Sequence, residues 1–441
     1  MILHCLKGHP LQSVLKQKDN VEMKGRTIMK ALVLAGSCSQ IVLLNQLKER
    51  GIYTILADNN VNAIARPYAD QFVKVDILNV EAVKKIAEEE KVDFLITVCA
   101  DQVLITVAKV SEMLGLPCYI DVKTACDVSD KSHMKAIFHA NGIPSSKHLF
   151  MEQLDAEKIK DMEYPLVVKP ADAYSSKGVR KATNFEELQV FFQEASNISR
   201  SGLVIVEEFV EGAELTVDYQ IVDGKAHLLS CSNTEKVDYK DRFLAFRTRF
   251  PAAISDDTLE RVRQIGQKIA DAFGLKNTPM LVQMLTNDKR ESVLEFCART
   301  GGGAKYLLLK MCTGFDPITA VIDLTLGNRV TVGEVKSQSK FYTNEFLYAY
   351  PGCFDHLEGF EELKQEGVLA EYWQFKWKGA QISNAVTSSD RVVSISIQAD
   401  SFEELVAKHN KAASTIKIID AEGNDMMRHD LLTDITDLTI R

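Results

Sequence analysis

The sequence predicts an α/β protein that begins with a doubly wound parallel sheet and becomes α+β in its C-terminal half. From Met29 to about Ile120, short apolar runs alternate with helical patterns of about ten residues or more, as in strand–helix–strand units. After about Glu214 the apolar runs become longer and fewer helices separate them. A chain of 441 residues is also too long for one core, so roughly two to four domains are expected.

The first unit is expected to span residues 29–120. Its strands are expected at Ala31–Ala35, Tyr53–Ala57, Phe72–Val75 and Phe94–Val98. Helices are expected between the strands, at Ile41–Arg50 and Val80–Glu90. Residues 1–28 are polar and weakly patterned, so we interpret them as an N-terminal extension, and Met29 would serve equally well as a start.

A central unit is expected over residues 121–330. It opens with a helix at Ser129–Ala140, which ends at Gly142 and Pro144, because glycine after a helix and proline shortly beyond it form a stop signal. A smaller α/β piece is expected at about 145–208. Its elements are a strand at Leu166–Lys169, a helix at Asn184–Ala195 and a strand at Leu203–Glu207. A long helix at Asp257–Phe273, capped by Gly274, is expected among the later strands.

The last unit, residues 331–441, is expected to mix strands with one helix. The strands are expected at Glu345–Tyr350 and Val392–Ala399, and the helix at Ser401–Ala413. The chain shows no internal repeat and no low-complexity segment.

Composition excludes several classes of function. The net charge of -9 argues against a nucleic-acid partner, although local clusters of cations can still bind small anions. The nine cysteines form no CxxC pair, and their odd number favours reduced thiols in a cytoplasmic protein. No apolar run reaches the ~20 residues needed to span a bilayer. No signal-peptide core is seen at the N-terminus, so a cytoplasmic location without a membrane partner is expected.

A dinucleotide site at the first strand is disfavoured. Gly36 follows a strand, and Asp58 ends the next strand at a spacing that suits a ribose-binding acid. The loop after Gly36 nevertheless lacks the second and third glycines of GxGxxG, so an ordinary strand–helix turn is the better interpretation. The chain has no GxxxxGK[ST] motif either, which excludes a Walker-type ATP site.

The strongest local signal is a charged strand end followed by three glycines. An apolar run leads to Glu295, Arg299 follows four residues later, and Gly301, Gly302 and Gly303 come next. Such glycines indicate that a backbone must approach something closely. Gln283 lies in the preceding apolar run, and the turn between the two runs predicts a hairpin in which Gln283 faces Glu295. Mg²⁺ is a fitting shared partner for these oxygens, whereas the alternative is a hydrogen-bonded pair without metal.

Two upstream lysines could meet an anion. Lys169 ends an apolar strand, where an ammonium is costly unless it finds a negative partner. The small-residue loop after it includes Ser175, Ser176, Lys177 and Gly178, and its backbone N–H groups could wrap phosphate oxygens. Lys131 at a helix start is a candidate second phosphate cation. The alternatives are a surface hairpin with a snorkelling Lys169 and a solvated Lys131.

The acidic segment at 207–214 follows another apolar run. An extended segment offers backbone groups that could pair with the edge of adenine, and Glu214 could accept hydrogen bonds from ribose hydroxyls. The alternative is an acidic, solvated turn.

Two arginines further along the chain are candidates for substrate binding. Arg247 and Arg249 alternate along what could be a strand edge, where one of them could bind a carboxylate. The alternative is that both arginines are solvated.

Taken in order, these residues resemble the ATP-grasp superfamily. The motifs that carry the resemblance are Asp130-Lys131, Val168-Lys169-Pro170, Ser176-Lys177-Gly178-Val179, Glu207-Glu208-Phe209-Val210, Glu214, Gln283, and Glu295 with Arg299. Within the superfamily the chain is similar to the carboxylate–amine ligases and to the carbamoyl-phosphate-synthase-like and biotin-carboxylase-like members. The resemblance covers about Met29 to Gly327 well and the tail more loosely. It implies a Rossmann-like pre-ATP-grasp domain at 29–120, an ATP-grasp core at 121–330 with a lid subdomain at about 145–208, and a C-terminal lobe at 331–441.

The resemblance also implies roles and cofactors, namely ATP with Mg²⁺ or Mn²⁺. Lys131 and Lys169 would hold ATP phosphates, and Ser175, Ser176, Lys177 and Gly178 would form the mobile lid loop. Glu208 and Val210 would meet adenine through their backbones next to Glu207, and Glu214 would hold the ribose. Gln283 and Glu295 would lie on the metal side. Arg299 would steady the acyl phosphate, with Lys169 as a second catalytic residue, and Arg247, Arg249, Gly301 and Gly302 would lie on the substrate side.

The implied activity is an ATP-dependent ligase that activates a small carboxylate as an acyl phosphate and joins it to an amine. The products would be a compound with an amide or peptide-like bond, ADP and phosphate. The expected partners are the small carboxylate and amine, and a second copy of the chain in a homodimer.

Two positions depart from the family. Cys297 stands where Asn is usual, and a thiol is a poor Mg²⁺ ligand; Ala298 replaces the usual Pro. The alternatives left open are a non-catalytic nucleotide-binding protein and a biotin-dependent carboxylase or carbamoyl phosphate activity.

Overall fold

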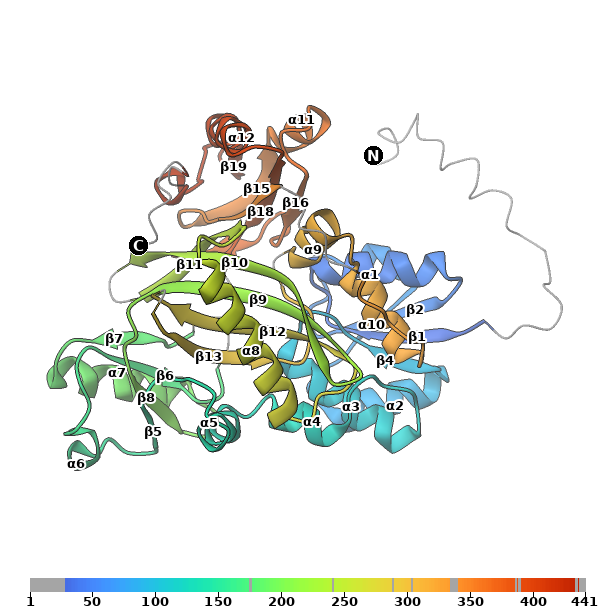
Figure 1. Ribbon diagram of the computed structural model, residues 1–441. Helices are drawn as coiled ribbons and strands as arrows, with labels where there is room; N and C mark the ends of the chain where they lie inside the picture. Colours follow the sequence, from blue (N-terminus) through green and yellow to red (C-terminus); the bar gives the residue numbers. More distant parts are fainter. Residues whose placement is uncertain are drawn as a thin grey trace, which may run out of the picture.

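The computed structural model describes residues 28–173, 177–239, 242–287, 289–302, 304–333, 340–384, 387, 390–432 and 435. Its helices and sheets confirm the predicted α/β class (Figure 1). The described strands form a parallel sheet at the N-terminal end, a small antiparallel sheet, a large antiparallel sheet through the centre, and a short three-stranded sheet near the C-terminus.

The N-terminal sheet is parallel, with strand order β3-β2-β1-β4. Its elements are β1 (Lys30–Leu34), α1 (Cys38–Glu49), β2 (Tyr53–Asp58), a 3-10 helix at Arg66–Tyr68, β3 (Gln71–Lys74), α2 (Val80–Glu90), β4 (Phe94–Ile96) and α3 (Asp101–Leu114). Alternate strand residues face opposite cores, because side chains alternate across a strand. Leu32 and Leu34 pack against α2 and α3, whereas Ala31 and Val33 pack against α1.

The small antiparallel sheet has the order β5-β8-β6-β7 and carries α7 on one face. The elements that lead to it and form it are α4 (Val122–Asp127), α5 (Lys131–Ala140), β5 (His148–Met151), α6 (Ala156–Ile159), β6 (Leu166–Pro170), β7 (Arg180–Ala182), α7 (Phe185–Ile198) and β8 (Val204–Glu208). Its core is separate from that of the central sheet. It forms a body of its own beside the central sheet (Figure 1).

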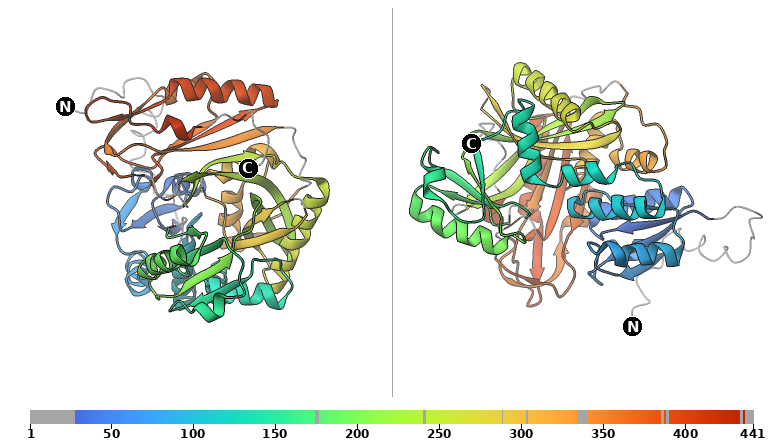
Figure 2. Two further views of the ribbon diagram at one scale, coloured as in Figure 1. Left: turned by 90° about the vertical axis from the view of Figure 1, so that its left-hand side faces the viewer. Right: turned by 90° about the horizontal axis from the view of Figure 1, so that it is seen from below.

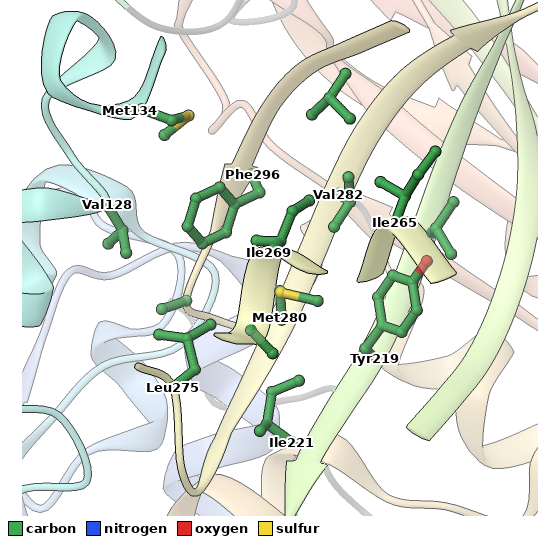
Figure 3. Packing of buried hydrophobic residues seen from close by; sticks show 14 of the residues in the cluster. Val128, Met134, Tyr219, Ile221, Ile265, Ile269, Leu275, Met280, Val282 and Phe296 are labelled. Atoms are coloured by element: carbon green, nitrogen blue, oxygen red, sulfur yellow. The ribbon is translucent and has the colours of Figure 1, made fainter. Parts of the chain in front are cut away.

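The central sheet has the order β13-β12-β9-β10-β11-β14-β18-β16. Its elements and the helices between them are β9 (Ala213–Val222), β10 (Lys225–Tyr239), β11 (Arg242–Phe250), α8 (Asp256–Ala272), β12 (Thr278–Thr286), β13 (Glu291–Cys297), α9 (Lys305–Thr313), α10 (Pro317–Thr325), β14 (Phe341–Leu347), β16 (Glu371–Gln374) and β18 (Val393–Ala399). The helix α8 covers one face, where Ile265, Ile269 and Val282 pack together (Figure 3). Gly266 permits this contact, because a Cβ there would lie 2.3 Å from a ring carbon of Tyr219.

The C-terminal residues continue the central sheet and add a second layer. Strands β14, β18 and β16 extend it, and β15 (Gly352–Glu358), β17 (Gln381–Ile382) and β19 (Lys417–Asp420) form the three-stranded sheet. The remaining helices are α11 (Phe360–Gln365), α12 (Phe402–Thr415) and a 3-10 helix at His429–Leu431. The N-terminal sheet, the small sheet and this C-terminal part surround the central sheet from different sides (Figure 2).

One expected strand is shifted. The pattern predicts a strand at Glu345–Tyr350, but β14 runs from Phe341 to Leu347. Its middle contains Thr343, Asn344 and Glu345, which are polar and yet buried, because they pair with β11 on one side and β18 on the other. Apolar alternation does not reveal a strand whose buried side chains are polar.

Candidate active site

A cavity lies where the N-terminal unit, α5 and β13 meet. Its charged and polar lining comes from the start of α3, the region around the start of α5 and the end of β13, at Asp101, Ser129, Lys131, Glu295, Cys297 and Arg299. Its apolar lining is Leu104, Val128, Met134, Phe296 and Ala298. Phe296 points into the core beneath α8 (Figure 3), so its strand neighbours Glu295 and Cys297 point to the opposite face.

Lys131 and Glu295 meet across this cavity. Asp130 caps α5 by accepting hydrogen bonds from the N–H groups of Ser132 and His133, which places Lys131 in the first turn. The Lys131 ammonium lies 3.0 Å from the Glu295 carboxylate and 3.1 Å from the Ala173 carbonyl oxygen. The positive charge of Lys131 holds the pKa of Glu295 below its usual value. The structure thus brings together one predicted phosphate cation and one predicted metal ligand.

Arg299 is held by a residue that sequence reasoning missed. Its Nε and Nη2 donate to the two carboxylate oxygens of Asp101, each at 2.6 Å, and its Nη1 donates to the Thr300 carbonyl oxygen at 2.9 Å. Burial would raise the pKa of Asp101, but the Arg299 charge outweighs it and the pKa is lowered. Asp101 carried a sequence signal, because it follows β4 at the carboxyl edge of a parallel sheet, where α/β proteins place ligand-binding groups.

Cys297 lies beside this ion pair and is partly buried. Burial raises the pKa of its thiol well above the usual value, and the negative charge of Asp101 adds to the effect. The side chain therefore stays a neutral thiol at physiological pH, and a neutral thiol is not a ligand for a hard cation. The seven cysteines whose side chains are described, including Cys297, are all free.

Lys169 pairs with a buried carboxylate. An ammonium at the end of a buried strand needs such a partner, because removing its charge from water costs free energy. Its Nζ donates to Glu207 on the neighbouring strand β8, and Ser146 donates to the other oxygen of Glu207 at 2.8 Å. Burial alone would raise the pKa of Glu207, but the charges of Lys169 and Lys135 and the hydrogen bonds hold it well below its usual value.

The low pKa of Glu207 gives a prediction for stability against pH. A carboxyl whose pKa is lower in the folded chain stabilises it above the unfolded pKa, about 4.3 for glutamate, and loses this effect as pH falls through the folded pKa. We expect the Glu207→Gln variant to be less stable than the wild type by about 3 kcal/mol at pH 7, and the difference to shrink below about pH 5. Urea unfolding at pH 7, 5 and 4 measures it, and a difference that grows on acidification would contradict the expectation.

The segment after β8 combines backbone groups with aromatic side chains. The Glu208 N–H donates to the Lys147 carbonyl oxygen at 3.0 Å, so a contact of Glu208 with adenine would go to its carbonyl. Phe209 stacks on Phe243 with ring centroids 6.2 Å apart, and the Lys181 ammonium lies 4.0 Å from the Phe209 centroid. Val210 follows directly in an irregular stretch.

Gln283 and Glu295 lie opposite each other in the β12–β13 hairpin, which confirms the predicted pairing. Gln283, however, donates from its amide nitrogen to Glu214 at 3.3 Å, and Lys236 donates to the other oxygen of Glu214. Glu214 is therefore surrounded by donors, and the metal role of Gln283 stays a prediction.

The structure describes only some of the residues predicted for the lid loop and for the glycine segment. Ser175 and Ser176 lie outside the described residues, whereas Lys177 is exposed. Gly178 has φ +74°, and a Cβ there would lie 2.9 Å from Pro170 Cγ. Gly301 is also required, because a Cβ there would lie 2.9 Å from the Asp218 carboxylate, which pairs with Lys305; around Gly302 there is open space.

The prediction that Arg247 and Arg249 lie at a strand edge is wrong. β11 lies between β10 and β14 in the middle of the central sheet. Arg247 is 1% exposed and pairs with Glu345 at 2.8 Å and Glu235 at 3.0 Å, and Arg249 lies 3.1 Å from Glu235. The charges of both arginines are thus balanced by protein carboxylates, which the sequence could not show because Glu345 is far away along the chain. A role in substrate binding stays a prediction.

Comparison with known proteins agrees with this geometry. A family model described as "D-ala D-ala ligase C-terminus" matches residues 137–312. Carbamoyl-phosphate synthase of Methanobrevibacter smithii is 21% identical over 67% of this chain and 80% of its own length. D-alanine–D-alanine ligase of Aromatoleum aromaticum is 27% identical over 44% of this chain and 64% of its own length.

Solved structures extend the likeness to nearly the whole chain. L-amino acid ligase from Bacillus licheniformis superposes with a TM-score of 0.76 and 20% identity, over 90% of this chain and 100% of that one. The biotin carboxylase domain of the Hydrogenobacter thermophilus 2-oxoglutarate carboxylase, solved with MgADP and bicarbonate, gives 0.73 and 16%, over 92% and 93%. The chain therefore has the fold of these proteins, the ATP-grasp fold.

Proposed function

We propose that this chain is an ATP-dependent ligase that activates a small carboxylate as an acyl phosphate and joins it to an amine. The observation that carries the proposal is the cavity between the N-terminal unit and the core, which Lys131, Glu295 and Arg299 all line and in which Lys131 pairs with Glu295. These residues supply cations and a carboxylate at one place, which is what phosphoryl and acyl transfer require. Lys169 lies at the end of a strand of the small sheet and adds another cation.

Each residue has a task in the two steps. In the first step a substrate carboxylate attacks the γ-phosphate of ATP and ADP leaves; in the second an amine displaces phosphate from the acyl phosphate. Lys131 and Lys169 would orient the triphosphate and neutralise its oxygens. Arg299, fixed by Asp101, would offer its remaining N–H groups to the acyl phosphate. The loop around Lys177 and Gly178 would exclude water that otherwise hydrolyses the intermediate.

Glu295 fits the Mg²⁺ or Mn²⁺ that this chemistry uses. Its carboxylate already lies 3.0 Å from the Lys131 ammonium, so it is aimed at a position that a cation can occupy. Glu295 would hold the metal together with phosphate oxygens, and the bound metal would neutralise charge on the transferred phosphoryl group. Cys297 does not fit this metal, because its thiol is neutral and soft.

Substrate-dependent ADP formation tests the proposal. Purified protein is incubated with Mg-ATP and panels of small carboxylates, including amino acids, with and without amines, and ADP and phosphate are measured together with ligated products by mass spectrometry. ADP that forms only with a particular carboxylate–amine pair, together with an amide product, supports the ligase. Tight nucleotide binding without turnover on any pair would instead support the second candidate, a non-catalytic nucleotide-binding protein, which only Cys297 favours.

Replacing Cys297 by asparagine tests how the metal is held. An amide oxygen two residues after Glu295 would add a hard ligand on the same face of β13. We expect Cys297→Asn to lower the Mg²⁺ concentration for half-maximal ADP formation by about tenfold, equivalent to about 1.4 kcal/mol of binding. Cys297→Ser serves as the control with a small polar side chain. An unchanged Mg²⁺ requirement in Cys297→Asn would mean that this position lies outside the metal shell.

The proposal also includes the oligomeric state and the cellular location of the chain. The related biotin carboxylase domain of 2-oxoglutarate carboxylase was solved as a dimer, and we infer a homodimer for this chain as well. The odd number of cysteines favours a cytoplasmic location. In the described part of the chain, no helix combines the length and apolar character needed to cross a membrane.

A further inference from the structure

A third lysine lies beside the two predicted phosphate cations. Lys135 follows Lys131 by one turn of α5, yet it is only 2% exposed. Its ammonium lies 3.5 Å from Glu207 and donates to the Val293 carbonyl oxygen at 3.3 Å. It therefore joins three elements, namely α5, strand β8 of the small sheet and strand β13 of the central sheet.

Glu207 is shared by two ammonium groups. Lys169 bonds one carboxylate oxygen, and Lys135 together with Ser146 approaches the other. Glu207 is 3% exposed, so solvent cannot replace either partner. A buried carboxylate needs only one close cation to be balanced, and the second ammonium is in excess as long as no other anion is present.

The two lysines differ in the freedom to leave Glu207. Lys169 is at the end of β6 and is 14% exposed. Lys135 is enclosed by the core and tied to Val293. A phosphate anion can therefore recruit Lys169, whereas Lys135 has to stay with the carboxylate. If Lys135 were absent, recruitment of Lys169 would leave Glu207 as an uncompensated buried charge.

We propose that Lys135 is a positioning residue that serves as the resident counter-ion of Glu207 and so frees Lys169 to bind the triphosphate of ATP. The inference rests on the proposed nucleotide-binding function. In the nucleotide-free chain Lys169 forms an ion pair with Glu207. In the complex with ATP, Lys169 replaces part of this contact by contacts with phosphate oxygens. The charge of Glu207 is balanced in both states because Lys135 does not move.

The charges around Glu207 are consistent with this arrangement. Burial lowers the pKa of Lys135, and Glu207 opposes that effect, so the ammonium depends on the carboxylate. His148, whose ring nitrogen Nδ1 lies 3.0 Å from the Ser146 carbonyl oxygen, is on the same side, and burial lowers its pKa, so it adds no further cation near neutral pH. Glu295 is already paired with Lys131.

Three variants test the inference through binding of Mg-ATP, measured by calorimetry, and through thermal unfolding without nucleotide. Lys135→Met keeps the length of the side chain and leaves Glu207 paired with Lys169, so the fold is expected to persist, with Lys169 pinned. We expect its dissociation constant for Mg-ATP to rise at least about tenfold. Adding Glu207→Gln to Lys135→Met removes the charge that pins Lys169, and we expect the affinity to return to within about threefold of the wild type. Lys364→Met, which removes a more exposed lysine paired with Glu371 in the C-terminal part, is the control and is expected to bind like the wild type.

The outcomes separate this inference from the proposed function. Absence of Mg-ATP binding by the wild type would overturn the proposed function and this inference with it. Wild-type binding together with undiminished binding by Lys135→Met would overturn the counter-ion role alone. A loss in Lys135→Met that Glu207→Gln does not restore would show that Lys135 acts through packing, which would also overturn it.

Discussion

Replacing Arg299 by methionine is expected to lower turnover by about 100-fold or more while Mg-ATP still binds. The guanidinium is the only described cation that lies beside both Asp101 and the backbone of Thr300, in the cavity lined by Glu295. Its bidentate contact fixes its plane, so its remaining donors are aimed before the acyl phosphate forms. Because that charge is needed most when the acyl phosphate is attacked, kcat should fall more than the KM for ATP rises.

The partner of Arg299 has to be controlled in this experiment. Arg299→Met leaves Asp101 as a partly buried carboxylate without its cation, which is expected to destabilise the chain. The double variant Asp101→Asn with Arg299→Met removes both charges, and its thermal unfolding should return toward that of the wild type while turnover stays low. Turnover that recovers in the double variant would show that Arg299 only neutralises Asp101, and near-normal turnover in Arg299→Met would remove the arginine from the chemistry.

A second variant separates orientation from charge. Asp101→Asn keeps Arg299 but replaces one charge-assisted acceptor by an amide, so the guanidinium loses its fixed plane. If ADP is then formed faster than the ligated product, the acyl phosphate is escaping to water, which identifies Asp101 as the residue that positions Arg299. Equal losses of ADP and product would instead place the defect before the acyl phosphate.

The helices and strands could be predicted from the sequence where the spacing of apolar residues is regular. The helix at Val80–Glu90 has the bounds expected from its pattern, and the alternation of strands and helices in the first unit predicts the parallel sheet that is observed. The Gln283–Glu295 pairing was predictable as well, because a turn between two apolar runs fixes a hairpin. These features depend on neighbours in sequence, which is why local patterns suffice.

The partners of the charged residues were not predictable in the same way. Asp101 and Arg299 are separated by 198 residues, and Arg247 and Glu345 by 98, so their contacts depend on how sheets and units come together. Lys135 looks in the sequence like one polar residue of an amphipathic helix, because its carboxylate partner lies on a strand 72 positions later, at Glu207. A single sequence shows that a buried charge needs a partner, and only the tertiary structure shows which partner it has.

The prediction with the second large effect concerns Glu295. Glu295→Gln is expected to lower Mg²⁺-dependent turnover by roughly 100-fold, because a neutral amide holds the metal weakly and the metal contributes several kcal/mol of charge stabilisation. The same substitution releases Lys131 from its ion pair, so binding of ATP in the absence of metal should become tighter than in the wild type. Opposite changes in these two quantities would distinguish a metal ligand from a residue that is merely structural.

Calorimetry with ATP in the presence of a chelator, and ADP formation against Mg²⁺ and Mn²⁺ concentration, measure the two sides of this prediction. Glu291→Gln is the control, since Glu291 lies on the same strand and also pairs with a cation, Arg261 at 3.0 Å, but is away from the cavity. It should lose stability without changing the metal requirement. If Glu295→Gln keeps the wild-type dependence on Mg²⁺, the carboxylate serves only to hold Lys131, and the metal must be bound by phosphate oxygens and other groups. If the binding of metal-free ATP also weakens in this variant, the Glu295–Lys131 pair supports the nucleotide site, and Glu295 does not compete with ATP for Lys131.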